Sequence, residues 1–127
     1  MHTRLKVMAA AALLSAGTVS LPVLAHHGWS WTESGFTQIE GKITAIYLGN
    51  PHATLDVDVE GQVWRVELAP PAATSAAGFV QGAAAVGDEV TVFGNKSQDV
   101  NEPRLKAVRV IVGEKTYDVY PDRAKNI

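Results

Sequence analysis

Residues 53–60 carry the pattern that most restricts the fold of this chain. Four apolar residues alternate there with four polar ones, Ala53, Leu55, Val57 and Val59 against Thr54, Asp56, Asp58 and Glu60. A period of two with a charged outer face is typical of a β-strand that is buried on one side. Gly61 and Gln62 continue into a turn short enough for a hairpin. The pattern therefore predicts an antiparallel sheet with one face turned to solvent.

Segments of similar length on either side predict the rest of the sheet. Strands are expected at 36–48, 63–68, 90–93, 104–112 and 115–120, with a loop at 96–103. Gly41 is expected to mark a bend or bulge in the first strand. In the strand at 63–68, Arg65 and Glu67 are expected to face outward. The single helical segment, at 72–79, begins after a proline and is rich in alanine.

This order of elements has few possible folds. Short antiparallel strands must close into a barrel or be covered, because open edges invite aggregation. Three strands, a helix and two more strands follow the order of the OB-fold. We therefore predict an all-β domain with one short helix, a small five- to six-stranded OB-like Greek-key barrel. A small β-sandwich is the alternative.

The first 25 residues resemble a secretory signal peptide. Arg4 and Lys6 precede a short apolar run at 7–16, and small residues lie at 23–25. The apolar run is shorter than the roughly 20 residues of a membrane-spanning helix, although an uncleaved anchor is the alternative. We expect a signal peptide at 1–25, an exposed His/Trp arm at 26–35, the barrel at 36–121 and a frayed C-terminal tail at 122–127. After cleavage, we expect the mature protein to be periplasmic.

Charge and composition exclude several classes of function. The 127 residues include 11 Lys and Arg against 13 Asp and Glu, and loss of the leader removes two of the basic residues. Nucleic acids and anionic membranes are bound by clustered basic residues. We therefore expect no nucleic-acid partner and no stable membrane association after cleavage. The chain has no cysteine, which excludes disulfides, thiolate metal ligands and a cysteine nucleophile.

Three histidines of the mature chain predict a metal site. Cleavage after Ala25 would leave a free amine on His26, beside His27. The amine and ring of His26 can chelate one ion, and an imidazole from His27 or His52 would complete a nearly planar nitrogen set that suits Cu(II). Cleavage one residue earlier would place His27 third, which also binds copper. We predict copper ligation by His26, His27 and His52.

Asn50 and Pro51 are expected to shape the loop that carries His52. Copper on nitrogen ligands alone is expected to serve storage, delivery or buffering, because electron-transfer sites favour a thiolate. Its affinity should fall as the pH drops through the histidine range, since a protonated imidazole cannot coordinate a metal. The alternative is that the histidine pair is merely solvated and that His52 caps a turn.

A second hypothesis is a metal-free binding module or adaptor for a protein or glycan partner in the periplasm. OB-folds often bind ligands along strands two and three, where this chain has Asp56, Asp58 and Arg65. Trp29 and Trp31 are expected to pack on the barrel, with stacking on a ligand as the alternative. The chain lacks Gly-x-Ser-x-Gly, phosphate-loop and His-Glu-x-x-His motifs, so we do not expect an enzyme.

Several motifs together resemble one family of small exported bacterial proteins of unknown function. The motifs are His26-His27-Gly28-Trp29-Ser30-Trp31, Gly41-Lys42-Ile43, Gly49-Asn50-Pro51-His52, Trp64-Arg65-Val66-Glu67-Leu68, 86–92 and 115–121. The family is typified by a double histidine after the signal peptide and a later Asn-Pro-His. The resemblance implies a periplasmic location and a small β-barrel, and it implies no activity.

Overall fold

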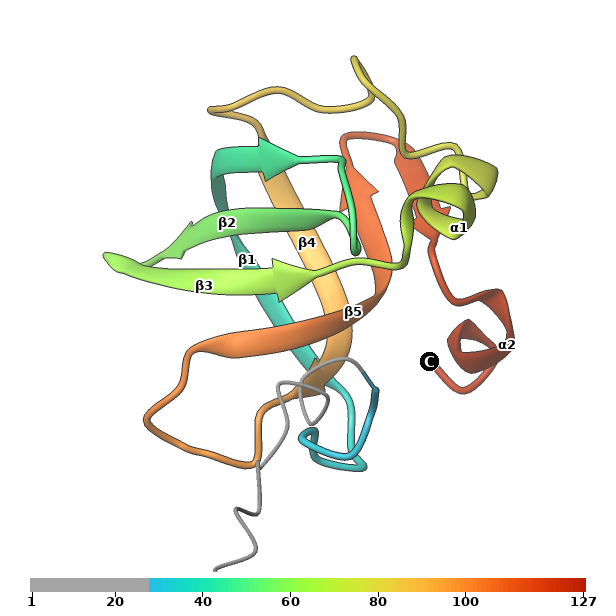
Figure 1. The fold of residues 1–127 in the computed structure, drawn as a ribbon. Helices are drawn as coiled ribbons and strands as arrows, with labels where there is room; N and C mark the ends of the chain where they lie inside the picture. Colours follow the sequence, from blue (N-terminus) through green and yellow to red (C-terminus); the bar gives the residue numbers. More distant parts are fainter. Residues whose placement is uncertain (1–27) are drawn as a thin grey trace, which may run out of the picture.

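The computed structural model describes residues 28–127 (Figure 1). The expected leader at 1–25, His26 and His27 lie outside the described residues. The strands are β1 (Thr37–Tyr47), β2 (Thr54–Val59), β3 (Gln62–Glu67), β4 (Glu89–Lys96), β5 (Arg104–Val112) and β6 (Lys115–Asp118), and the helices are α1 (Pro71–Ala76) and α2 (Pro121–Ala124). The strand expected at 90–93 is longer than its apolar core suggested.

Five of the strands close into a barrel. Their hydrogen-bonded order is β3-β2-β1-β4-β5-β6, and β3 also pairs with β5 in parallel, which closes the ring. The closing pairs run from Arg65 opposite Arg104 to Glu67 opposite Lys106. Helix α1 lies between β3 and β4 in the chain, and β6 extends the sheet beyond β5 (Figure 1). This confirms the OB-like Greek-key barrel.

The alternation that predicted β2 also places its side chains. Ala53, Leu55 and Val57 are fully buried in the core, whereas the polar residues between them are partly exposed. The β2–β3 hairpin turns through Glu60 and Gly61, which have φ angles of 52° and 88°. Both lie in the left-handed region that such a two-residue turn requires. Strand β2 is therefore a half-buried strand, as predicted.

Two glycines allow neighbouring strands to approach closely. A Cβ atom on Gly41 would lie 2.1 Å from the backbone oxygen of Asp58, and one on Gly94 would lie 2.1 Å from that of Lys106. Neither distance is possible for a real side chain, so both positions require glycine. Gly41 lies in β1, where a bend or bulge was expected, but the register shift of β1 against β2 lies between Ile43 and Ala45. Gly94 lies at a register shift between β4 and β5.

Both ends of the described chain pack against the barrel, which corrects two expectations. The arm was predicted to be exposed, but Trp31 and Thr32 are buried, and Thr32 forms a bridge with Ser97. The Asn95 amide donates to the backbone oxygens of Glu33 and Gly35, each at 3.1 Å. The tail at 122–127 was expected to fray, but Pro121–Ala124 form α2, whose Ala124 is buried.

The helices are short. Helix α1 begins at Pro71, one residue before the expected start, and ends at Ala76, three residues before the expected end. Phe79 follows it and is buried, with its ring edge-on to Tyr117 at a centroid distance of 5.2 Å. Within residues 28–127, neither helix has the length and apolar character needed to span a bilayer.

Candidate functional site

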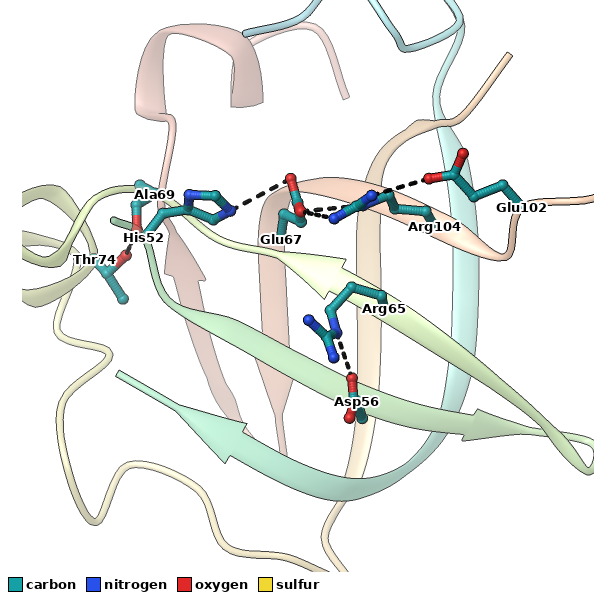
Figure 2. A network of polar contacts seen from close by, with 8 residues as sticks. All are labelled: His52, Asp56, Arg65, Glu67, Ala69, Thr74, Glu102 and Arg104. Atoms are coloured by element: carbon teal, nitrogen blue, oxygen red, sulfur yellow. Dashed lines mark hydrogen bonds and ion pairs between the residues drawn. The ribbon is translucent and has the colours of Figure 1, made fainter. Parts of the chain in front are cut away.

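A row of charged side chains joins the loop after β1 to the end of β3 and the start of β5 (Figure 2). Nε2 of His52 lies 3.5 Å from Oε2 of Glu67. Nε of Arg104 donates to Oε1 of the same carboxylate at 3.0 Å, and its Nη1 donates to Oε1 of Glu102 at 3.1 Å. The four side chains therefore form one polar network with Glu67 at its centre.

Backbone contacts on both sides of His52 fix its position. The hydroxyl of Tyr47 donates to the backbone oxygen of Asn50 at 2.6 Å, and the Asn50–Pro51 peptide is cis. On the other side, the N–H of Ala53 donates to the oxygen of Ala69 at 3.1 Å. The loop that carries His52 is thus held by hydrogen bonds on both sides of this residue.

Glu67 is 2% exposed although the alternation of β3 predicted it to face solvent. Its side chain lies between Arg104 from β5 and His52 from the loop before β2, and it is paired with both (Figure 2). Its Oε1 accepts the bonds from Arg104. Its Oε2 accepts no hydrogen bond from residues 28–127 and faces His52. A buried carboxylate oxygen without a donor is unusual, because such groups are costly to desolvate.

A groove of about 410 Å³ runs beside this network. Six of the side chains that line it are Tyr47, His52, Thr54, Arg65, Glu67 and Arg104. Within it, Nε of Arg65 donates to Oδ1 of Asp56 at 2.7 Å. The groove follows β2 and β3, which is the ligand face expected for an OB-like barrel.

Asp58, the third residue predicted for this face, has a structural role. Its Oδ1 accepts a hydrogen bond of 2.8 Å from the N–H of Gly61 and so stabilises the β2–β3 turn. Asp56 is paired with Arg65, as described above. Asp58 therefore stabilises a turn and Asp56 forms an ion pair.

The two tryptophans of the arm dock beside the same network. The guanidinium carbon of Arg104 lies 5.5 Å from the centre of the Trp31 ring. Trp29 contacts Nζ of Lys106 at 4.9 Å and the guanidinium carbon of Arg123 at 3.6 Å, each measured to its ring centre. Its ring is also edge-on to Tyr120. Both indoles therefore pack on the barrel, which was one of the two predicted roles.

The cations of this region have shifted pKa values. Burial alone would lower the pKa of Arg104, but its hydrogen bond to Glu102 and the charge of Glu67 outweigh that effect and raise it. Burial lowers the pKa of Lys106, the nearby charge of Glu67 opposes this, and the charge of Arg123 adds to it. Arg104 is thus a permanent cation, whereas the charge of Lys106 is destabilised by its surroundings.

Within residues 28–127, no group of three or more His, Asp or Glu side chains is arranged to hold a metal ion. Of the three predicted ligands, only His52 is described, and it pairs with Glu67. Glu67 belongs to one of the motifs identified from the sequence but was expected to face outward, and Arg104 and Lys106 were not identified from the sequence. The parallel pairing of β3 with β5 brings Glu67, Arg104 and Lys106 together. This pairing is long-range, so no local sequence pattern predicts it.

A chain in the crystal structure of the S. pombe Stn1–Ten1 complex is similar, with a TM-score of 0.49 and 24% sequence identity. The match covers 72% of this chain and 63% of that one, so this chain spans less than two thirds of its length. No curated protein matches this chain.

A family model accounts for most of the sequence. The model of DUF6152, a family of unknown function, matches residues 12–106, or about three quarters of the 127 residues. This confirms the resemblance to a family of unknown function that the histidine, Asn-Pro-His and strand motifs suggested. The chain therefore belongs to the DUF6152 family.

Proposed function

We propose that this protein is exported to the periplasm and binds Cu(II) at its mature N-terminus. In this proposal, His26 supplies its amine and imidazole, His52 supplies a further imidazole, and His27 is available as a fourth ligand. One observation carries the proposal. The arm that follows His27 docks through Trp29 and Trp31 on cations that neighbour Glu67, and Glu67 faces His52.

The length of chain involved supports this arrangement. Trp29 lies three positions after His26, and an extended chain covers about 3.5 Å per residue, or about 10 Å in all. Trp29 packs on Lys106, whose register partner is Glu67, and paired strands lie about 4.8 Å apart. A mature N-terminus at His26 would, in this proposal, lie close enough to His52 to share an ion with it.

The ligand chemistry favours Cu(II) over softer ions. Amine and imidazole nitrogens suit Cu(II), whereas Cu(I) prefers sulfur. The chain has no cysteine, and its two methionines, Met1 and Met8, both precede the expected cleavage point. We therefore propose a role in copper storage, delivery or buffering.

The test uses protein purified from the periplasm, so that the N-terminus is the natural one. Its mass should correspond to a chain that begins at His26. In a competitive Cu(II) titration, the His26→Ala and His52→Ala variants should each bind Cu(II) at least about tenfold more weakly than the wild-type protein. Asp58→Ala, which alters only the β2–β3 turn, is the matched control and should keep the wild-type affinity. Unchanged affinity in both histidine variants would overturn the proposal.

The groove along β2 and β3 supports a second candidate, a metal-free module that binds a protein or glycan. Arg65 lies in this groove with its side chain 50% exposed, so a ligand can reach it directly. Under this alternative, Asp56→Ala and Arg65→Ala would impair the cellular function while His26→Ala and His52→Ala would not. The copper proposal predicts the opposite pattern.

A further inference from the structure

We infer that Glu67 is an oxygen ligand of the copper ion, through Oε2, and that Arg104 holds the carboxylate in the required orientation. This inference rests on the proposed function and adds to it a residue that the histidine motifs do not include. It would convert an all-nitrogen site into a mixed nitrogen and oxygen site inside the groove.

The separation of the two donor atoms is the first argument. Two ligands at about 2.1 Å from one ion lie about 3.0 Å apart at a right angle and about 3.4 Å apart at a tetrahedral angle. Nε2 of His52 and Oε2 of Glu67 are 3.5 Å apart. A charge-assisted hydrogen bond between them would be shorter, at about 2.7–2.9 Å. The observed spacing is therefore closer to that of two ligands on one ion.

The unequal use of the two carboxylate oxygens is the second argument. Oε1 of Glu67 accepts both bonds from Arg104, which fixes the plane of the group. Oε2 is buried, accepts no hydrogen bond from the described residues and is turned toward His52. Metal-binding carboxylates are commonly held this way, with one oxygen bonded by the protein and the other left for the ion.

The position of Glu67 in the groove is the third argument. Glu67 and His52 both line the 410 Å³ groove, so an ion between them would be reached from solvent. A cation there would compensate the desolvation of Oε2, which no described donor offsets. Oxygen and nitrogen ligands together suit divalent ions, so the site should favour Cu(II) over Cu(I).

The experiment compares Glu67→Gln with the matched control Glu102→Gln in the periplasmic protein. Both carboxylates bind Arg104, but only Glu67 faces His52. We expect Glu67→Gln to weaken Cu(II) binding at least about tenfold and to shift the Cu(II) electron paramagnetic resonance spectrum, because a charged ligand is lost. Glu102→Gln should retain the wild-type affinity and spectrum.

The outcomes separate this inference from the proposal on which it rests. If wild-type protein binds no copper, the proposed function itself fails. If His52→Ala weakens binding but Glu67→Gln leaves the spectrum unchanged, Glu67 is not a ligand and only this inference is overturned. Should Glu67→Gln not fold, Glu67→Asp keeps the charge but is one methylene shorter, and it should show the same loss of affinity and a spectral shift.

Discussion

The guanidinium carbon of Arg123 lies 3.6 Å from the centre of the Trp29 indole ring, and this contact joins the C-terminal helix to the N-terminal arm. Lys106 contacts the same ring. The arm and α2 therefore stabilise each other, although they lie at opposite ends of the described chain (Figure 1). Cation–π contacts of this kind contribute about 0.5–2 kcal/mol each.

Trp29→Ala should release the arm without unfolding the barrel. The N–H of Thr32 donates to the oxygen of Trp29, and that of Gln98 donates to the oxygen of Trp31. Loss of the indole should speed hydrogen exchange at both amides by at least about tenfold, which corresponds to roughly 1.4 kcal/mol. Val100→Ala is the control, since Val100 is 86% exposed. Unchanged exchange at Thr32 would show that Trp29 does not hold the arm.

Arg104→Met should destabilise the fold by about 3 kcal/mol, because it leaves the buried Glu67 carboxylate without its cation. The double variant Arg104→Met, Glu67→Leu should recover part of that loss, since no charge is then buried. Lys125→Ala breaks an exposed pair with Asp122 and should change stability by less than about 0.5 kcal/mol. Urea denaturation measures all three. Equal stability of the single and double variants would contradict a central role for the charge of Glu67.

Gly94→Ala should destabilise the barrel by at least about 2 kcal/mol, because its Cβ would overlap the backbone oxygen of Lys106. Gly35→Ala is the matched control, since a Cβ there has no neighbour within 4 Å. Thermal denaturation of the two variants compares them directly. Similar melting temperatures would mean that β4 and β5 can separate at this point at little cost.

Lys106 should make stability depend on pH. Burial lowers the pKa of Lys106 below its ordinary value of 10.5. Between the lowered pKa and that value, the unfolded chain binds more protons than the folded one, so the free energy of unfolding rises with pH. Lys106→Met should lack this rise. Urea denaturation of both proteins at several pH values between about 7 and 10 tests it, and parallel curves would contradict it.

Burial also raises the pKa of Tyr120, the charge of Arg123 opposes this, and the charge of Glu67 adds to it. A raised tyrosine pKa costs stability above its ordinary value of 10.0. Tyr120 is present in both proteins, so the comparison of wild type with Lys106→Met largely cancels its effect.

Local patterns predicted the barrel well. The alternation at 53–60 gave β2 and its buried face, and the run at 104–112 coincides with β5. The helix between the third and fourth strands then identified the topology. Each of these features is set by neighbours in the sequence, through the period of two, proline and glycine.

The candidate site could be predicted only in part. His52 was identified from its motif, but Glu67 was expected to face solvent because alternation reports direction and not what covers a face. The partners of Glu67 are Arg104 and His52, which come from other elements of the chain. Likewise, no periodicity in the arm indicated that Trp29 and Trp31 would contact cationic side chains on β5 and α2. Such long-range pairings are visible only in the folded barrel.

The parallel ladder between β3 and β5 has a consequence for when the protein can work. This strand pairing closes the barrel and places Glu67 beside Lys106 and Arg104. A polypeptide that passes unfolded through a translocation channel has not yet formed this pairing. If the chain is exported and binds copper as proposed, the metal site would therefore form only after transport and take its ion from the compartment in which the chain folds.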